Sequence, residues 1–285
     1  VKELLWIIDS KPSAAVRIKT INFGILGAQN VISETGDGLE FLKAVSEKLD
    51  WIYLDPSRRD DAGGRVFFLS DCLPNVPEEL ELLQKRSRNV LLKTSPLLDL
   101  QAGIRELQNI YEIHIIAVDN EVKELLWILK AETSEEIKIR TINFQKQEQQ
   151  IFEGIFSRQL QEKYSNPKAF LFEPNAAIMK SSLFAALGKQ LGLEKLHPNT
   201  HLFTSDEPAD FPGRSFRILE TLPYRKKLIS KALPSGKAHV ATRNFPESVA
   251  QIRKKLKLQD GGDDYLFFTT LEDEQKVVLL CRKIE

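Results

Sequence analysis

An acid, a proline, a hydroxyl and two guanidinium groups follow one another where an apolar run of the sequence ends. Residues 51–54 (WIYL) have the composition of a buried strand, and residues 55–59 (DPSRR) come directly after them. In open α/β sheets, ligands bind at the carboxyl ends of the strands, which is where these side chains would lie. Pro56 fixes its own backbone and restricts the residue before it, so we expect the Asp55 carboxylate to point in one direction. A strand end followed by a solvated basic turn is the alternative interpretation.

The side chains of this segment suit acid–base chemistry and anion binding. A carboxylate can accept a proton or orient an amino group, and guanidinium groups bind phosphates or carboxylates through paired hydrogen bonds. As the alternative to anion binding, the two arginines would form ion pairs with Asp60 or Asp61. The candidate catalytic residues are Asp55, Pro56, Ser57 and Arg58, and Arg59 is a candidate substrate-binding residue.

A second apolar run is expected to end at the same edge of the sheet. Residues 89–93 are predicted to form a strand that leads into Thr94-Ser95-Pro96. Lys93 and Ser95 would then face the same pocket as Asp55 and are candidate substrate-binding residues. Because no cysteine follows this strand, we do not expect covalent catalysis through a thiolate.

Composition narrows the class of protein. No apolar run reaches about 18 residues, so no membrane span is expected. The first residues carry charges of both signs and show no cleavage site of a signal peptide. Two cysteines cannot form a disulfide framework, and the four histidines lack the spacing of metal ligands, so we expect a cytoplasmic protein without a metal.

Charge is distributed unevenly along a chain whose formal net charge is zero. Residues 1–144 carry 18 Lys and Arg against 23 Asp and Glu, whereas residues 211–285 carry 15 against 9. A basic C-terminal region favours an anionic partner, most simply nucleic acid. A solvated helix face explains the cluster at residues 253–257 equally well.

The chain contains an internal repeat. Residues 1–23 and 122–144 align without gaps and share 13 of 23 residues, including VKELLWI and TINF. Each copy has two apolar runs around a polar loop, which predicts a hairpin-like unit. Two distant copies do not make a solenoid.

Elsewhere, strands and helices alternate, which predicts an α/β fold with a mainly parallel sheet and an antiparallel edge. The expected helices are 39–49, 77–86, 101–107, 175–192 and 246–256, and the expected strands are 30–33, 51–54, 89–93, 112–118, 121–129, 137–144, 265–270 and 276–281. Residues 121–129 could also be helical.

Several segments together resemble a known family. They are residues 22–42 (NFGILGAQNVISETGDGLEFL), 51–59, 64–76 (GRVFFLSDCLPNV), 91–100 (LLKTSPLLDL), 117–127 (AVDNEVKELLW), 172–180 (FEPNAAIMK), 211–216 (FPGRSF) and 243–267 (RNFPESVAQIRKKLKLQDGGDDYLF). Residues 55–58 resemble the Asp-Pro-x-Arg motif of class I S-adenosylmethionine (SAM)-dependent methyltransferases. The full set is similar to bacterial methyltransferase-like proteins that end in a THUMP-like domain.

This resemblance implies a cofactor and the residues that bind it. SAM is the implied cofactor, and Asp37, Gly38 and Asp55 are the implied cofactor-binding residues, with Asp37 at the adenine amino group. An ordinary turn aspartate is the alternative for Asp37. The family has a strand, a glycine-rich loop, a helix and a second strand ahead of this region, and no such loop is found in this sequence.

The resemblance also implies three domains and an RNA substrate. Residues 1–144 would form a partial Rossmann-like methyltransferase domain, residues 145–210 a small ferredoxin-like α+β domain, and residues 211–285 a THUMP-like α/β domain. Because THUMP modules generally bind RNA, a tRNA or rRNA is the expected partner, and Arg214, Arg243 and Lys254 are candidate phosphate ligands. A homodimer is also possible on the sequence alone.

Three hypotheses follow. The first is a SAM-dependent methyltransferase that acts on RNA. The second is a catalytically inactive, methyltransferase-like protein that binds RNA or serves as an accessory factor, which the missing glycine loop favours. The third is a chain whose sheet lacks neighbouring strands and folds poorly. SAM affinity separates the first two, and cooperative unfolding separates both from the third.

Overall fold

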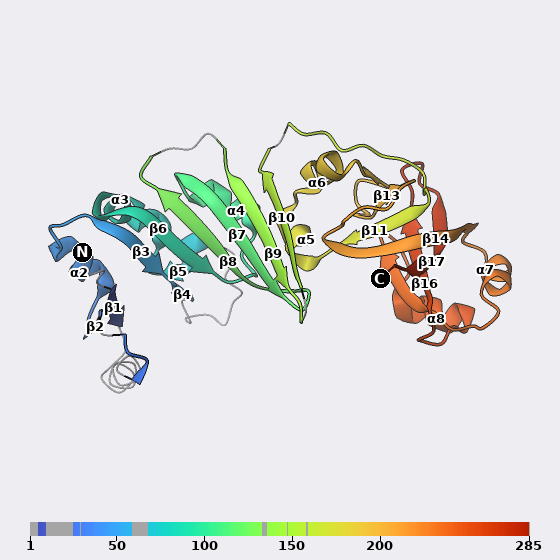
Figure 1. Ribbon diagram of the computed structural model, residues 1–285, viewed down its shortest axis with the longest axis horizontal. Coiled ribbons are helices and arrows are strands. Elements are labelled where there is room, and N and C mark those ends of the chain that lie inside the picture. Colours follow the sequence, from blue (N-terminus) through green and yellow to red (C-terminus); the bar gives the residue numbers. More distant parts are fainter. Residues whose placement is uncertain are drawn as a thin grey trace.

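The computed structural model describes residues 5–9, 25–28, 30–58, 68–132, 136–146, 148–157 and 159–284, with only the backbone described for residues 5–9, 33 and 58. Two lobes follow one another along the longest axis of the molecule (Figure 1). The first lobe is built on a six-stranded sheet and the second on a seven-stranded sheet. The mixed α/β fold expected from the sequence is therefore confirmed.

The elements of the first lobe run from the N-terminus to a long β-hairpin. They are β1 (Leu5–Asp9), β2 (Val31–Thr35), α2 (Gly38–Ala44), β3 (Leu49–Leu54), β4 (Ser57–Arg58), the 3-10 helix η1 (Leu69–Asp71), β5 (Cys72–Leu73), α3 (Val76–Arg86), β6 (Ser87–Thr94), α4 (Leu100–Glu106), β7 (Ile110–Val118), β8 (Glu121–Lys130), β9 (Lys138–Phe144) and β10 (Gln149–Ile155). Residues 121–129, which suited a strand or a helix, lie in strand β8.

The central sheet of this lobe has the order β10-β9-β7-β8-β6-β3. β3 is parallel to β6 and β7 is parallel to β9, whereas β8 runs antiparallel between β6 and β7. The edge strand β10 is antiparallel to β9, as expected. The sheet is not mainly parallel, however, because three of its five strand pairs are antiparallel and the antiparallel strand β8 lies inside it. The turn of only two residues between β7 and β8 explains this position, because so short a connection can join only antiparallel neighbours.

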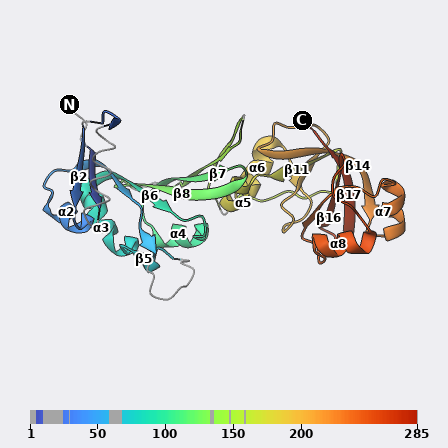
Figure 2. The same cartoon turned by 90° about the horizontal axis from the view of Figure 1, so that it is seen from below.

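One face of the six-stranded sheet carries the core of the lobe. Along β8, Leu125, Trp127 and Leu129 are fully buried, and the residues between them are partly exposed. This alternation places every second side chain on the covered face. Helices α3 and α4 lie against that face, and in the view from below no helix of the described residues lies over β6 and β8 on the opposite side (Figure 2).

The second copy of the repeat does not form a hairpin, and residues 10–23 of the first copy lie outside the described residues. In the second copy, β8 and β9 both pair with β7, which lies between them. In the first copy, the structure describes only residues 5–9, and this strand, β1, pairs in parallel with β2 in a separate two-stranded sheet. The hairpin prediction fails because residues 110–118, which precede the second copy, pair with both of its strands.

The second lobe combines a seven-stranded sheet with short helices. Its elements are β11 (Phe170–Pro174), α5 (Ala176–Ser181), α6 (Phe184–Leu191), β12 (Glu194–Lys195), β13 (Phe203–Ser205), β14 (Gly213–Pro223), α7 (Lys226–Ala232), β15 (His239–Arg243), α8 (Val249–Leu256), β16 (Asp264–Thr270) and β17 (Lys276–Lys283). The strand order is β12-β13-β11-β14-β17-β16-β15. The predicted hairpin of residues 265–270 and 276–281 is present as β16 and β17.

Several boundaries differ from the sequence expectation. The helix expected over residues 39–49 ends at Ala44, since residues 49–54 form β3, and the helix expected from residue 246 begins at Val249. The helix expected over residues 175–192 is two helices, because Ser182 has a left-handed backbone (φ 58°) that ends α5. Residues 145–150, expected to be a linker or a helix start, instead contain the turn that leads into β10, which pairs with β9. The domain limits at residues 144 and 210 stay predictions, and one continuous sheet crosses the second limit through the pairing of β11 with β14.

No helix within the described residues has the length and apolar character needed to span a membrane.

Candidate functional site

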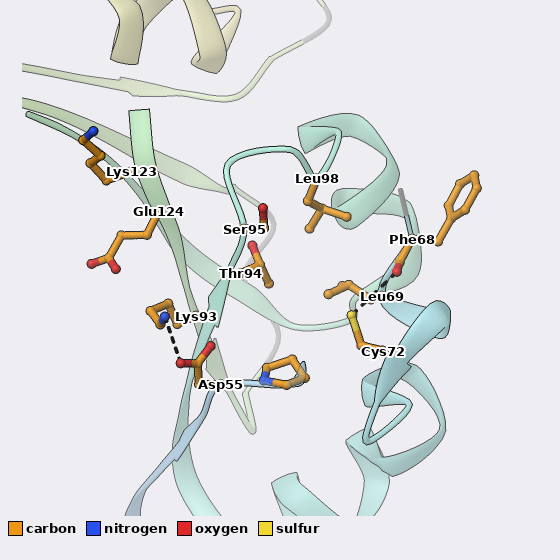
Figure 3. A pocket seen from close by; sticks show the side chains of 11 residues that line it. Asp55, Phe68, Leu69, Cys72, Lys93, Thr94, Ser95, Leu98, Lys123 and Glu124 are labelled. Atoms are coloured by element: carbon orange, nitrogen blue, oxygen red, sulfur yellow. Dashed lines mark hydrogen bonds and ion pairs between the residues drawn. The ribbon is translucent and has the colours of Figure 1, made fainter. Parts of the chain in front are cut away.

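A pocket of about 180 Å³ lies at the carboxyl ends of β3 and β6. It is lined by Asp55, Pro56, Phe68, Leu69, Cys72, Lys93, Thr94, Ser95, Leu98, Lys123 and Glu124 (Figure 3). Four of the residues selected from the sequence, Asp55, Pro56, Lys93 and Ser95, thus line one cavity. The parallel register of β3 and β6, in which Leu54 faces Leu92, brings the two strand ends together.

An ion pair between Asp55 and Lys93 occupies one wall of this pocket. The Lys93 Nζ atom lies 2.8 Å from Asp55 Oδ2, and the two side chains point toward each other in Figure 3. The side chain of Asp55 is 48% exposed and that of Lys93 is 31% exposed, so a ligand in the pocket could reach both. The hydrogen bond to Asp55 raises the pKa of the Lys93 ammonium group, against the opposing effect of its partial burial. Lys93 therefore stays charged at neutral pH and orients the Asp55 carboxylate.

Trp127 supports the carboxyl end of β6 from the covered face of the sheet. The Trp127 indole is fully buried, and its Nε1–H donates a hydrogen bond to Thr94 Oγ1 at 2.9 Å. Gly103 in α4 leaves room for the ring, because a Cβ atom there would lie 2.5 Å from it. The sequence analysis missed Trp127 as a supporting residue, although its central position in an alternating apolar strand was a usable signal.

The far wall of the pocket comes from residues that the sequence analysis did not select. The 3-10 helix η1 brings Leu69 to the pocket and is held by Glu106, whose carboxylate accepts hydrogen bonds from Leu69 N at 2.8 Å and Ser70 Oγ at 3.1 Å. Cys72, in β5, is buried and lines the same wall. No motif marked these residues, since they meet the strand ends only through the tertiary fold.

Glu124 adds a second carboxylate near the ion pair. It projects from β8, and its negative charge contributes to the raised pKa of Lys93. The lining of the pocket thus holds two carboxylates, of Asp55 and Glu124, and two ammonium groups, of Lys93 and Lys123 (Figure 3). Such a site offers both hydrogen-bond acceptors and donors to a polar ligand.

The rest of the 55–59 segment is described in part. Ser57 is exposed and its hydroxyl donates to the Leu73 carbonyl at 3.4 Å, within the antiparallel pairing of β4 and β5. Arg58 belongs to β4, but its side chain and the whole of Arg59 lie outside the described residues. Their roles as catalytic and substrate-binding residues stay predictions.

Asp37 and Gly38, the implied cofactor residues, do not line this pocket. Asp37 caps α2, accepting hydrogen bonds at Oδ1 from Leu39 N at 2.8 Å and Glu40 N at 3.2 Å, and Gly38 is the first residue of that helix. Asp37 and Gly38 therefore do not share a cavity with Asp55. Cofactor binding by Asp37 and Gly38 stays a prediction.

The predicted phosphate ligands lie in the second lobe. Arg214 and Arg243 converge on the buried carboxylate of Glu173; Arg214 Nε lies 2.8 Å from Glu173 Oε2, and Arg243 Nη2 bonds the other oxygen. Both guanidinium groups are still partly exposed. Lys254 is exposed on α8, and no ion pair of it is found among residues 159–284. These three residues do not share a cavity with Asp55.

Comparison with known proteins agrees with this architecture. Residues 170–212 match a family described as a ferredoxin-like domain, and residues 213–283 match a family described as THUMP domain-like. The chain is also similar to the crystal structure of a "putative methyltransferase from Porphyromonas gingivalis W83", with a TM-score of 0.82 and 29% sequence identity over 100% of this chain and 78% of that one. No curated protein matches the chain. The chain therefore has the fold of that methyltransferase-like protein along its whole length and ends in a ferredoxin-like and a THUMP-like domain.

Proposed function

We propose that this chain belongs to a SAM-dependent methyltransferase that acts on RNA. The observation that carries the proposal is the Asp55–Lys93 ion pair in a pocket at the ends of two parallel strands, on a chain that shares its fold with a methyltransferase-like protein. SAM is the methyl donor that the resemblance implies, with Asp37 and Gly38 as candidate ligands. The residues of this chain supply the side of the pocket where the methyl acceptor binds.

Asp55 is the residue expected to meet the acceptor. Its carboxylate can hold an amino or hydroxyl group by accepting a hydrogen bond, and it can take up the proton that a methylated nitrogen or oxygen must lose. Lys93 fixes the direction of this carboxylate, since its ammonium group lies 2.8 Å from Asp55 Oδ2. Pro56 and Ser95 line the same cavity and would shape the space around the acceptor.

RNA is supported as the substrate by the C-terminal domain. The family match over residues 213–283 is to a THUMP-like domain, and residues 211–285 carry 15 Lys and Arg against 9 Asp and Glu. Exposed Lys254 and the partly exposed Arg214 and Arg243 are candidate contacts to phosphates, together with Arg58 and Arg59, which follow Asp55 in the sequence. Such contacts would position an RNA without selecting its sequence.

Replacing Asp55 with asparagine tests the enzyme proposal. We expect the rate of radiolabelled methyl transfer from SAM to bacterial tRNA or rRNA to fall by about 10²- to 10⁴-fold, because the amide can orient an acceptor but cannot take its proton. The matched control is Asp119→Asn, an exposed aspartate with left-handed backbone at the β7–β8 turn, where asparagine is well tolerated. An Asp55→Asn protein as active as the control would remove Asp55 from the mechanism.

Replacing Lys254 with glutamine tests the RNA proposal. We expect weaker binding to tRNA and a decrease of about 1 in the slope of log affinity against log salt, as for the loss of one phosphate contact. Electrophoretic mobility shifts between 50 and 200 mM salt, conditions at which such slopes are measured, provide the test. Lys48→Gln, at an exposed lysine of the first lobe, is the control. An unchanged slope would place the RNA elsewhere.

The second candidate is a catalytically inactive protein that binds RNA or assists another enzyme. It is favoured by the position of Asp37, which caps α2 and does not line the pocket. Titration calorimetry with SAM separates the two candidates. Micromolar binding supports the enzyme, whereas no binding by a protein that unfolds cooperatively supports the inactive form.

A further inference from the structure

Helix α5 belongs to the second lobe but packs on the sheet of the first lobe. It contacts β7, β8 and β9, and Figure 1 shows it between the two sheets. Ala177 and Ile178 of this helix are fully buried in the same hydrophobic core as Ile115 and Leu125 of the sheet. Helix α5 lies within residues 170–212, which match a ferredoxin-like domain. This domain therefore supplies part of the core under the sheet that carries the pocket.

The last turn of α5 reaches the loop between β6 and α4. This loop, residues 95–99, is named the pocket loop, because Ser95 and Leu98 line the pocket. The Lys180 ammonium group donates a hydrogen bond to the Leu98 carbonyl oxygen at 2.7 Å. Partial burial lowers the pKa of Lys180, against the opposing charge of Asp99. The hydrogen bond is thus partly shielded from water, which strengthens it electrostatically.

The pocket loop also has hydrogen bonds of its own. Leu98 N donates to the Ser95 carbonyl at 3.1 Å, which closes a turn, and the Asp99 carboxylate accepts from Ala102 N at 2.8 Å, which caps α4. These bonds shape the loop locally, between residues close in sequence. The Lys180 bond joins the loop to a helix residue 82 positions later in the sequence, so it decides where the loop lies relative to the rest of the pocket.

The N-terminal end of α5 is held by the turn between β7 and β8. Asn120 in this turn accepts a hydrogen bond at Oδ1 from Ala176 N at 2.7 Å, and its own N–H donates to Asn143 Oδ1 at 3.0 Å. The strand that follows this turn carries Lys123 and Glu124, which line the pocket. Both ends of α5 are therefore bonded to segments that carry or lead into pocket residues.

A buried polar network fixes α5 in this place. Gln150 Oε1 accepts hydrogen bonds from Asn143 Nδ2 at 3.1 Å and from Asn175 Nδ2 at 3.2 Å, and both asparagines are buried. Gln150 Nε2 donates to the carbonyl of Gly213, the first residue of β14, at 3.2 Å. Buried networks whose members are bonded to one another are rigid. Lys180 thus projects from a helix with a well-defined position.

We propose that Lys180 is a positioning residue for the pocket: through the Leu98 carbonyl it holds the pocket loop where Ser95 and Leu98 meet the methyl acceptor. This role rests on the proposed function, because it assumes that the pocket takes an acceptor. Lys180 is not among the described residues that line the pocket, so it acts through Leu98 and not by contact with the ligand. A displacement of about 1 Å at a reacting site can cost about 10²-fold in rate.

Replacing Lys180 with methionine in the full 285-residue chain tests the proposal, since methionine keeps much of the side chain length but donates no hydrogen bond. We expect the amide hydrogens of Leu97 and Leu98 to exchange about tenfold faster, while those of β16 and β17 stay unchanged. In methyl transfer from radiolabelled SAM to tRNA or rRNA, kcat should fall by about tenfold or more and KM for the RNA should stay the same. A general loss of stability would instead speed exchange in β16 and β17 as well.

Two further variants serve as controls. Lys180→Arg keeps a cationic donor and should restore most of kcat and the slow exchange of the pocket loop. Lys189→Met, at an exposed lysine of α6, should behave as the parent chain does. The proposal is wrong if Lys180→Met leaves the exchange of the pocket loop unchanged, if its kcat equals that of Lys189→Met, or if Lys180→Arg is as impaired as Lys180→Met.

Asn120→Gly gives a second route should Lys180→Met fail to fold. Asn120 is exposed and has a left-handed backbone (φ 62°) that glycine tolerates, so the substitution keeps the turn and removes the side-chain bond to Ala176. Release of this end of α5 should speed exchange in the pocket loop by about threefold. Unchanged exchange would show that α5 does not hold the loop.

Failure of this proposal can be distinguished from failure of the proposed function. A parent chain that transfers no methyl group to RNA would exclude the proposed function and the role of Lys180 in that reaction. Faster exchange of the pocket loop in Lys180→Met, reversed in Lys180→Arg, would still support the hold of Lys180 on the loop. An active parent chain whose pocket loop exchanges normally in Lys180→Met would support the enzyme and exclude the positioning role.

Discussion

Replacing Trp127 with alanine is expected to lower the free energy of unfolding by about 3–5 kcal/mol, the usual cost of removing a large aromatic side chain from a core. The ring is fully buried in β8 and fills the space that Gly103 leaves open on α4. Removal of the ring leaves a cavity that the sheet cannot close without moving α4. It also removes the donor of the hydrogen bond to Thr94, at the edge of the pocket.

Urea denaturation monitored by circular dichroism measures this loss. Trp51→Ala is a matched control, because the same side chain on the same sheet is 53% exposed there, and we expect a change within about 0.5 kcal/mol. For Trp127→Phe, the loss in the free energy of unfolding should fall between those of the two alanine variants. Phenylalanine keeps most of the side chain volume but leaves Thr94 without its hydrogen-bond donor. Equal losses for Trp127→Ala and Trp51→Ala would contradict the described packing of this sheet.

Replacing Glu173 with glutamine is expected to lower the free energy of unfolding by about 3 kcal/mol. Glu173 is buried in β11 and accepts hydrogen bonds from Arg214 in β14 and Arg243 in β15. A glutamine would keep one acceptor oxygen but direct its NH2 group toward one of the two guanidinium donors, and it would remove the negative charge that neutralises them. The loss is large because this carboxylate joins the ferredoxin-like part of the lobe to the THUMP-like part.

Thermal unfolding of the full chain measures this effect, with Glu272→Gln as the control at an exposed glutamate. The same variant separates two roles of the arginines. If Arg214 and Arg243 also bind RNA phosphates, Glu173→Gln should raise RNA affinity at low salt, since it frees their charge. A variant as stable as the control would show that the guanidinium groups do not depend on Glu173.

Much of the sheet edge that lines the pocket could be predicted from local sequence. The apolar run at residues 51–54 and the run at residues 89–93 both form strands, and the polar residues after each lie at one edge of the sheet, as the rule for parallel strands requires. Asp55 and Lys93 were chosen on that basis, and the structure pairs them at 2.8 Å. The apolar composition of each run and the direction of the strand were sufficient for this result, because both depend on a few neighbouring residues.

The partners of each strand could not be predicted in the same way. The letters Leu-Trp-Ile occur in β1 and again in β8, yet β1 has one parallel partner and β8 has two antiparallel ones. An identical local sequence has identical local preferences, so the difference comes from the rest of the chain. This is also why the second copy of the repeat, β8 and β9, did not form the hairpin that its pattern suggested.

By itself, the sequence determined the α/β class, most helices and strands, the two strand ends at the pocket, and the basic character of the C-terminal region. Only the tertiary structure decided that Glu124 and η1 complete the pocket wall, that Glu173 holds two arginines, and that β3 pairs with β6 alone among the described strands. The physical reason is the separation in sequence over which each kind of interaction acts. Periodicity, capping and charge act between residues close in sequence, whereas these contacts join residues that are tens of positions apart and depend on the packing of the whole sheet.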